Sequence, residues 1–221
     1  MSHNDKAIIE RFSALATASV SDALDRLGLP GSALGIAPLD KGQRLVGRAF
    51  TVKYVPVGSA PGTVGDYIDD VEPGQVVVLD NDGRLYCTVW GDILTAVAHA
   101  KGIAGTAIYG VCRDVARAFQ LGYPIYSCGR FMRTGKDRVE VAGVNIPVSL
   151  GDVQVRSGDL ILGNDDGVVV VPRDQEERVL EVAITIVERE VHILEDALGG
   201  TPLREARAKY GYHILQRKAE R

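Results

Sequence analysis

The strongest constraint on the fold is an alternation of strand and helix patterns between about residues 85 and 128. "LYCTVW" resembles a strand, "GDILTAVAHAKG" has the spacing of an amphipathic helix, and "AGTAIYGV" is typical of a buried strand. A second helix pattern, "DVARAFQLG", and a further strand, "YPIYSC", follow. Because this alternation is typical of parallel strands joined by crossover helices, we expect a partly parallel layer with helices on it.

The N-terminal third of the chain predicts helix and then strand. "DKAIIERFSALATASVSDALDRLG" has apolar residues at helical spacing, with Ser21-Asp22 as a cap at which the helix restarts and Gly28 at its end. "RLVGRAFTVKYVPV" indicates a strand pair or one long strand. "QVVVLD" and "LYCTVW" flank "NDGR", which predicts a hairpin.

The C-terminal third changes from short strands to helices. Residues 138–172 alternate between β-branched runs and turns, and "RDQEERVLEVAITIVEREVHILEDALGG" then predicts a long helix, followed by a shorter one in "TPLREARAKYGY". We expect one α/β domain over residues 1–221, with a helical extension from about 174 to 221.

Composition excludes some classes of partner. The chain has 221 residues and a net charge of −4, so its overall field favours neither nucleic acid nor an anionic membrane. Three cysteines without a paired spacing argue against a disulfide framework. The start of the chain has no signal-peptide pattern and no apolar run is long enough to span a bilayer. We expect a cytoplasmic protein.

Two polar pairs stand where strands give way to helices. Gly91-Asp92 opens one helix pattern, and Arg113-Asp114 follows the next strand. Strand carboxyl ends and helix amino ends share one crevice in layered α/β folds, where the free N–H groups from Gly91 to Leu94 can bind an anion. Arg113 offers a planar donor for a carboxylate or oxyanion, and the aspartate oxygens suit Mg²⁺ or Mn²⁺.

A simpler reading of the same residues is equally consistent with the pattern. Aspartate is a favoured helix N-cap, so Asp92 and Asp114 are also explained as caps, with Arg113 paired to one of them. Spacing alone does not separate the two readings.

Asp92, twenty intervening residues and then Arg113-Asp114 resemble the D-x20-R-D motif of metal-dependent pyruvate aldolases in the RraA-like family. The similarity extends through "SVSDALDRLG", "LVGRAFTVK", "WGDILTAVAHAKGIAGTAIYGVCRD", "LGYPIYSCGR" and "NIPVSLGDVQVRSGDLILGNDDGVVVVP" to "REARAKYGY". The resemblance implies a β/β/α fold like the swivelling phosphohistidine domain, assembled as a homotrimer or homohexamer with the site between subunits.

The resemblance also implies roles for individual residues. Asp114 would bind the divalent metal directly, and Asp92 would hold it through water. The amides of Gly91, Asp92, Ile93 and Leu94 would take the pyruvyl carboxylate, with Arg113 beside the keto oxygen. Glu190 from a neighbouring subunit is the best match for a further ligand through water, with Glu188 as its competitor.

The implied activity is cleavage of 4-hydroxy-2-oxo acids, such as 4-hydroxy-4-methyl-2-oxoglutarate, to pyruvate and a second carbonyl compound. Oxaloacetate decarboxylation would share the enolpyruvate intermediate. The alternative is a non-catalytic regulator that binds a ribonuclease, although such members lack the full aspartate set that Asp92 and Asp114 complete here.

Other candidate residues have simpler explanations. Lys53 is the strand-borne candidate for a Schiff base, but a solvent-facing lysine explains it better. Cys112 is more simply a small buried residue than a nucleophile. Arg130, Arg133 and Lys136 are candidates for contact with a distal carboxylate of the substrate, or are simply exposed.

Overall fold

The computed structural model describes residues 3–59 and 62–215, which fall into two compact units. We call residues 32–173 the sheet unit, and residues 1–31 together with 174–221 the helical unit. The predicted C-terminal extension thus shares a unit with the N-terminal helices. The grouping of residues 1–221 as a single domain stays a prediction.

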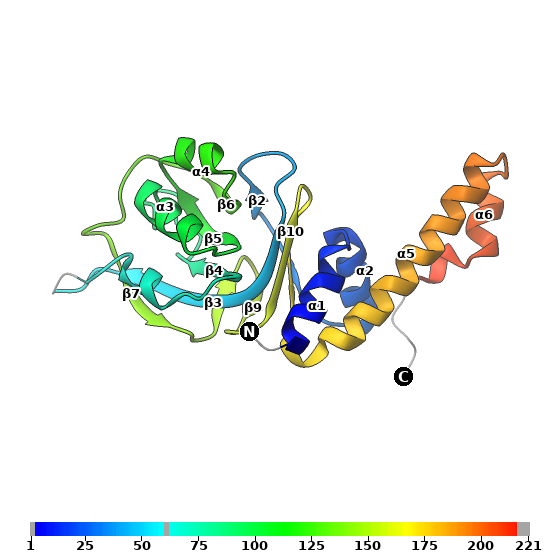
Figure 1. Cartoon of the computed structure of the whole chain (residues 1–221), viewed down its shortest axis with the longest axis horizontal. Helices are drawn as coiled ribbons and strands as arrows, with labels where there is room; N and C mark the ends of the chain where they lie inside the picture. Colours follow the sequence, from blue (N-terminus) through cyan, green and yellow to red (C-terminus); the bar gives the residue numbers. More distant parts are fainter. Residues whose placement is uncertain (1–2, 60–61, 216–221) are drawn as a thin grey trace. The chain divides into compact units, whose positions relative to one another are not determined.

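The sheet unit is built on one large mixed sheet (Figure 1). Among the described residues it has nine strands, in the order β1-β11-β10-β3-β4-β5-β6-β2, with β7 also paired to β3. The pairs β3–β4, β4–β5 and β5–β6 are parallel, and the remaining pairings are antiparallel. The strands are β1 Ser32–Ala33, β2 Ala37–Pro38, β3 Leu45–Pro56, β4 Gln75–Asp80, β5 Gly105–Cys112, β6 Ile125–Arg130, β7 Val139–Val144, β10 Leu160–Asn164 and β11 Gly167–Val171.

Layers on the two faces of this sheet give the β/β/α arrangement. Alternate residues of β4 point to opposite faces. Val77 and Leu79 belong to a core with helices α3 (Asp92–Ala100) and α4 (Val115–Leu121). Val76 and Val78 belong to a core with the two-stranded sheet of β8 (Val148–Leu150) and β9 (Val153–Val155). The predicted α/β class and its β/β/α layering are confirmed.

The parallel layer alternates between strands and helices as predicted, but one of the predicted strands is absent. The alternation runs β4-α3-β5-α4-β6, and residues 85–90 are a loop rather than a strand. The N–H groups of Asn81 and Gly83 donate to the carbonyl of Tyr109 on β5, at 3.0 and 3.2 Å. Because β5 occupies the edge of β4 in parallel register, the predicted hairpin around "NDGR" is wrong.

One long strand and two short 3₁₀ helices complete the sheet unit and its junction with the long C-terminal helix. The segment that predicted a strand pair or one long strand is the single strand β3. It is followed by the 3₁₀ helix η1 (Asp66–Asp70), and a second 3₁₀ turn, η2 (Arg173–Gln175), precedes the long C-terminal helix.

The helical unit contains α1 (His3–Ser13), α2 (Thr17–Leu27), α5 (Glu176–Leu198), α6 (Leu203–Lys209) and η3 (Tyr212–Ile214). The expected restart of the helix at Ser21-Asp22 is wrong, because both residues lie inside α2 and the chain breaks at Ala16, which is extended. Gly28 ends α2 as predicted, with φ of 71° in the left-handed region.

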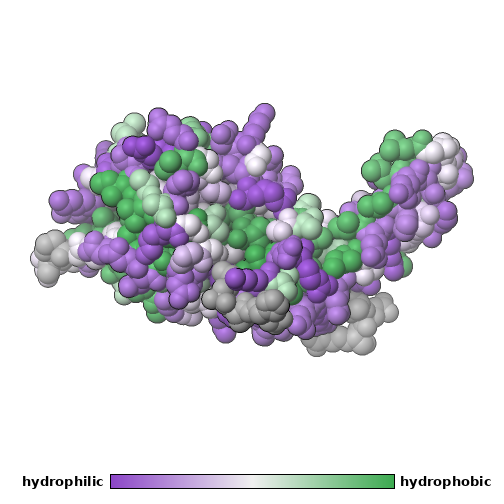
Figure 2. Space-filling view, viewed as in Figure 1, coloured by the Kyte–Doolittle hydropathy of each residue, from purple (hydrophilic) through white to green (hydrophobic). Residues whose placement is uncertain are grey.

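Helix α2 packs against α5, and both helices bury aliphatic side chains, such as Leu24 on α2 and Leu180 on α5. The far half of α5 instead exposes apolar side chains, and Figure 2 shows hydrophobic surface along it. They recur at helical spacing on one stripe, at Val191, Leu194 and Leu198. Within residues 3–59 and 62–215, no helix is long and apolar enough to cross a membrane.

Candidate active site

Helix α3 begins at a point that buried side chains hold in place. The indole N–H of Trp90, a residue only 2% exposed, donates to Thr95 Oγ1 at 2.9 Å. Thr95 in turn donates from Oγ1 and from its backbone N–H to the carbonyl of Gly91, at 2.8 and 3.0 Å. The start of α3 is therefore anchored by a buried hydrogen-bonded chain rather than by a capping side chain.

Some of the backbone amides at the start of α3 make no hydrogen bond to the residues that the structure describes. The N–H of Thr95 bonds back to the carbonyl of Gly91, so the amides of the three preceding residues have no backbone carbonyl to bond to within the helix. The N–H of Ile93 donates to Asp92 Oδ1 at 2.8 Å. The amides of Asp92 and Leu94, with the positive end of the helix dipole, remain as donors for an anion.

Arg113 and Asp114 follow β5 and lie against the start of α3. The N–H of Arg113 donates to the carbonyl of Trp90 at 3.0 Å. A Cβ placed on Gly91 would lie 2.9 Å from Asp114 Oδ2 and 3.5 Å from Arg113 Nε. The structure thus brings both polar pairs together at one end of the parallel strands, and a side chain at position 91 would crowd the Asp114 carboxylate.

Asp114 does not act as a helix cap, although it stands at the N-cap position of α4. Its side chain makes no capping hydrogen bond, and Oδ2 pairs instead with Arg113 Nε at 3.2 Å. Its backbone is left-handed, with φ of 55°, which costs a non-glycine residue about 1 kcal/mol. An aspartate whose carboxylate pairs with Arg113 and does not cap its own helix fits a binding role better than a capping role.

Two hollows adjoin this pair of residues, and Arg113 lines both. A cavity of about 380 Å³ contains the start of α3, from Gly91 to Leu94, and is also lined by Thr88, Thr134, residues 63–66, Ile68 and Asp69. We call it the amide cavity. A second hollow of about 250 Å³, which we call the Arg130 hollow, is lined by Cys112, Arg113, Asp114, Val115, Arg130, Phe131 and Met132.

The carboxylates fit a hydrated divalent cation. The Asp114 side chain is 42% exposed, and Asp92 is exposed. No group of three or more His, Cys, Asp or Glu side chains in the described part of the chain could enclose a metal. Mg²⁺ commonly keeps several waters and takes only one or two carboxylates, so the donor set suits Mg²⁺ or Mn²⁺ and gives no reason to expect a site rich in histidine or cysteine.

Glu190 and Glu188 lie on α5, in the helical unit. Partial burial and the negative charge of Asp22 on α2 raise the pKa of Glu190. Glu188 is exposed. A role for Glu190 as a metal ligand through water stays a prediction.

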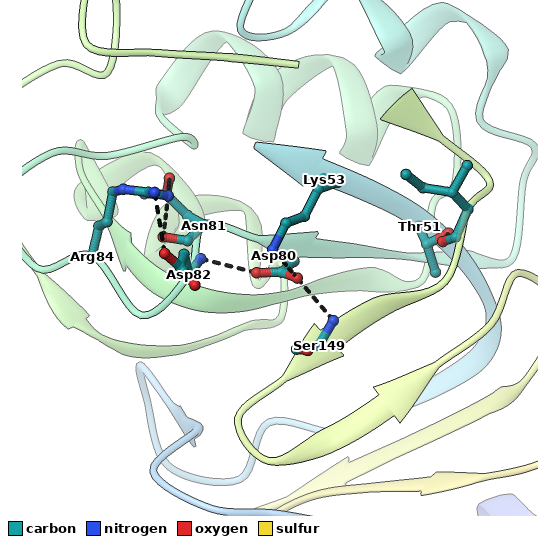
Figure 3. A network of polar contacts seen from close by, with 8 residues as sticks. Thr51, Lys53, Asp80, Asn81, Asp82, Arg84 and Ser149 are labelled. Atoms are coloured by element: carbon teal, nitrogen blue, oxygen red, sulfur yellow. Dashed lines mark hydrogen bonds and ion pairs between the residues drawn. The ribbon is translucent and has the colours of Figure 1, made fainter. Parts of the chain in front are cut away.

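Lys53 is engaged in a structural network that Figure 3 shows from close by. Its Nζ lies 2.7 Å from Oδ2 of Asp80, a carboxylate that is 2% exposed. The same oxygen accepts the N–H of Ser149 at 2.8 Å, which joins β4 to β8. This contact gives Lys53 a structural explanation, in place of the Schiff-base role, and Lys53 lines neither the amide cavity nor the Arg130 hollow.

Sequence reasoning missed two features of the site. The Trp90-Thr95 contact was readable in principle, since a threonine five residues after a tryptophan spans the first helical turn. The Arg130 hollow was not, because it depends on β6 lying beside β5. Cys112 is buried, and burial raises the pKa of its thiol, which supports the reading as a packed residue.

Comparison with known proteins identifies relatives over most of the chain. Residues 17–170 match the family model described as RraA-like, Aldolase/RraA. The chain is 39% identical to protein DlpA of Legionella pneumophila over 89% of its own length, but spans only 32% of DlpA. It is 35% identical to the "Putative 4-hydroxy-4-methyl-2-oxoglutarate aldolase" of Halalkalibacterium halodurans, covering 83% of this chain and 85% of that one.

Solved structures share the fold. An uncharacterised protein from Pseudomonas syringae superimposes with a TM-score of 0.85 at 41% identity, covering 91% of this chain and 97% of that one. RraAS2 of Streptomyces coelicolor, described as an unusual member of the RNase ES inhibitor RraA family, gives a TM-score of 0.78 at 27% identity. That match covers 84% of this chain and 96% of RraAS2.

Proposed function

The chain belongs to the RraA-like, aldolase/RraA family, and on that premise we propose that it is a divalent-metal-dependent aldolase. Its substrates are 4-hydroxy-2-oxo acids such as 4-hydroxy-4-methyl-2-oxoglutarate, which it cleaves to pyruvate and a second carbonyl compound. The observation that carries the proposal is the contact of the Arg113-Asp114 pair with Gly91 at the start of α3. In this proposal the amides at the start of α3 bind an anion, Arg113 stabilises an oxyanion and Asp114 binds the metal, and their closeness supports it.

The start of α3 binds the pyruvyl carboxylate in this proposal. The amides of Asp92 and Leu94 donate to it, and the helix dipole favours its negative charge. Trp90 and Thr95 keep these donors in position before substrate arrives, so little reorganisation is needed on binding. The neighbouring Ile93 amide contributes by holding the Asp92 carboxylate.

Asp114 would hold Mg²⁺ or Mn²⁺ directly, with Asp92 and Glu190 holding it through water. When bound, the ion supplies a Lewis acid that polarises the 2-oxo group. The side chain of Asp114 is short, with one methylene group, and its carboxylate pairs with Arg113, so the position of the carboxylate is restricted. In this proposal Glu190 comes from the helical unit of a neighbouring subunit, so the site needs more than one copy of the chain. We therefore propose a homotrimer or homohexamer. The exposed apolar stripe of α5 supports association between copies.

Cleavage breaks the bond between C3 and C4 of the substrate. The bonding electrons move toward the 2-oxo oxygen, giving the enolate of pyruvate, and Arg113 stabilises the negative charge as it develops there. The C4 hydroxyl loses its proton and becomes the new carbonyl. Asp92 accepts that proton at Oδ2, which takes no hydrogen bond from any residue that the structure describes, and the return of a proton to C3 of the enolate then gives pyruvate. Oxaloacetate loses CO₂ to give the same enolate, so we propose decarboxylation as a second activity.

A direct test is pyruvate release from 4-hydroxy-4-methyl-2-oxoglutarate and from oxaloacetate, with Mg²⁺, Mn²⁺ or EDTA. Metal-driven decarboxylation without enzyme is subtracted. We expect turnover that EDTA abolishes. Arg113→Met should lower kcat on both substrates while Arg117→Met, a change at an exposed position on α4, leaves it unaltered. No turnover of either substrate with any of these ions would refute the proposal.

The alternative function is regulation of a ribonuclease without catalysis. The similarity to RraAS2 favours it, at lower identity than the aldolase-named relative. Co-purification with a ribonuclease, together with absence of Mg²⁺ or Mn²⁺ binding, would favour the regulator over the enzyme.

A further inference from the structure

One wall of the amide cavity comes from a segment with little regular structure. The cavity is lined there by residues 63–66, Ile68 and Asp69, and we call residues 63–69 the cavity wall. The 3₁₀ helix η1 begins only at Asp66, and residues 63–65 belong to no helix or strand. Contacts with other elements must therefore fix the position of this part of the wall.

The cavity wall packs against a residue of the anion site. A Cβ placed on Gly65 would lie 3.3 Å from Leu94 Cδ2, so the wall lies against the side chain of a residue whose amide binds the pyruvyl carboxylate in the proposed function. The wall also carries Asp66 and Asp69, whose carboxylates repel an anion in the cavity more strongly the closer they lie to it. Anion binding at the start of α3 therefore depends on where the wall is held.

Tyr54 on β3 holds the wall through a buried hydrogen bond. Its side chain is 0% exposed, and its hydroxyl donates to the carbonyl of Val64 at 2.6 Å. The hydroxyl of Tyr67, which is also in the wall, lies 3.3 Å from that of Tyr54, and the Tyr67 ring stacks on Phe50. Burial raises the pKa of both phenols, so both hydroxyls keep their protons over the pH range of an ordinary assay.

A backbone contact holds the neighbouring residue of the wall. The N–H of Val141 on β7 donates to the carbonyl of Thr63 at 3.0 Å, and Val141 is the register partner of Tyr54 in the β3–β7 pair. Two successive carbonyls of the wall are thus bonded to two paired strands of the large sheet. Of these two bonds, the one from Tyr54 comes from a side chain, so a substitution can remove it without changing the backbone.

We propose that Tyr54 is a positioning residue for the amide cavity: its hydroxyl fixes the cavity wall and so supports binding of the pyruvyl carboxylate at the start of α3. The inference rests on the proposed aldolase function, which places that carboxylate on the amides of Asp92 and Leu94. Tyr54 lines neither the amide cavity nor the Arg130 hollow, so it acts through Val64 and not by contact with the substrate. Because the carboxylate is bound before and during cleavage, a displaced wall raises KM and leaves kcat nearly unchanged.

The test compares wild type with Tyr54→Phe, which removes one hydroxyl and keeps the ring. Calorimetry with Mn²⁺ present measures the Kd of pyruvate, and turnover of 4-hydroxy-4-methyl-2-oxoglutarate gives kcat and KM. Since one net hydrogen bond changes an equilibrium constant roughly fivefold, we expect Kd and KM to rise about fivefold and kcat to stay within about twofold of wild type. Mn²⁺ affinity should not change, because Asp114 lines the Arg130 hollow and not the amide cavity.

Tyr126→Phe is the matched control. Tyr126 is also 0% exposed, and its hydroxyl donates to the carbonyl of Gln43 at 2.8 Å. It belongs to the core on the β8–β9 face of the sheet and lines neither the amide cavity nor the Arg130 hollow. Both substitutions remove one buried hydrogen bond to a carbonyl, so both should lower Tm by a similar amount, and only Tyr54→Phe should weaken pyruvate binding.

Weaker pyruvate binding in Tyr54→Phe that Tyr126→Phe does not share supports the inference. Wild-type affinity in Tyr54→Phe, equal weakening in both variants, or a fall in kcat without a change in KM would overturn it. A fall in Tm far beyond that of Tyr126→Phe would also overturn it, because the hydroxyl would then support the fold and not the wall. A wild type that binds no pyruvate overturns it too. A wild type that binds pyruvate but cleaves neither 4-hydroxy-4-methyl-2-oxoglutarate nor oxaloacetate refutes the aldolase function alone, and the binding measurement still decides the role of Tyr54.

Discussion

Gly91→Ala is the substitution that most clearly separates the geometry of the site from the stability of the fold. The backbone of Gly91 is extended, with φ of −149° and ψ of −165°, so alanine adopts it without strain. The added Cβ would lie 2.9 Å from Asp114 Oδ2, about 0.5 Å inside the 3.4 Å at which ordinary contact begins. The carboxylate of Asp114 must move, and the backbone need not.

This displacement sets the expected size of the effect. Because a misplacement of about 1 Å costs on the order of 100-fold in rate, a shift of about 0.5 Å should cost roughly tenfold in kcat. Alanine also lowers the entropy of the unfolded chain by about 0.4–1 kcal/mol, which offsets the local crowding. For a chain of this size we expect Tm to change by no more than about 3 °C.

The assay is metal-dependent pyruvate release, paired with calorimetric titration of Mn²⁺ and thermal unfolding. Gly58→Ala is the control, because among the described residues a Cβ there would meet only Glu140 Oε1, at 3.8 Å. Wild-type turnover and Mn²⁺ affinity in Gly91→Ala would refute the reasoning. A large fall in Tm would also refute it, since that would place the cost in the fold.

Three further predictions concern the support of the site and the ionisable groups. Thr95→Val removes the acceptor of the buried Trp90 indole and should lower the free energy of unfolding by about 1–3 kcal/mol in urea titration, with a fall in kcat. Lys53→Met should destabilise by about 1–3 kcal/mol, since the buried Asp80 loses its cation, yet retain kcat; loss of activity at unchanged stability, with borohydride trapping of pyruvate in wild type, would favour a Schiff base. Burial, with a nearby negative charge, raises the pKa of Glu190, so the folded chain binds this proton more tightly and stability falls as pH rises from the unfolded pKa through the folded one. Glu190→Gln should therefore raise Tm at about pH 7 and not at about pH 4, and an equal shift at both would contradict this.

Local patterns were sufficient to predict the parallel layer and the meeting of its polar residues. Helical spacing after Gly91 and a buried strand before Arg113 indicate a crossover unit, and its topology brings strand ends and helix starts to one crevice. The same rule predicted that Asp92 and Asp114 would approach Arg113. Their chemical roles came from the motif and remain proposals.

Features that depend on pairing between distant segments were not readable. Residues 85–90 have the composition of a strand. They cannot pair with β4 in a hairpin, however, because β5 already pairs with that edge of β4. The left-handed backbone of Asp114 and the close approach of its carboxylate to Gly91 are features that no local pattern encodes. Arg130 lines a hollow with Arg113 and Asp114 because β6 lies beside β5, with Arg130 opposite Cys112.

The central claim is that the Asp114 carboxylate holds the ion on which cleavage depends. Asp114→Asn tests it most directly, because asparagine tolerates the left-handed backbone and only the charge is lost. Mn²⁺ affinity and pyruvate release from 4-hydroxy-4-methyl-2-oxoglutarate are measured on the same samples, with Asp82→Asn, also left-handed but outside both hollows, as the control. We predict that Asp114→Asn loses Mn²⁺ binding and turnover together while Tm stays within about 2 °C of wild type. Mn²⁺-dependent turnover at the wild-type rate in Asp114→Asn would contradict the account.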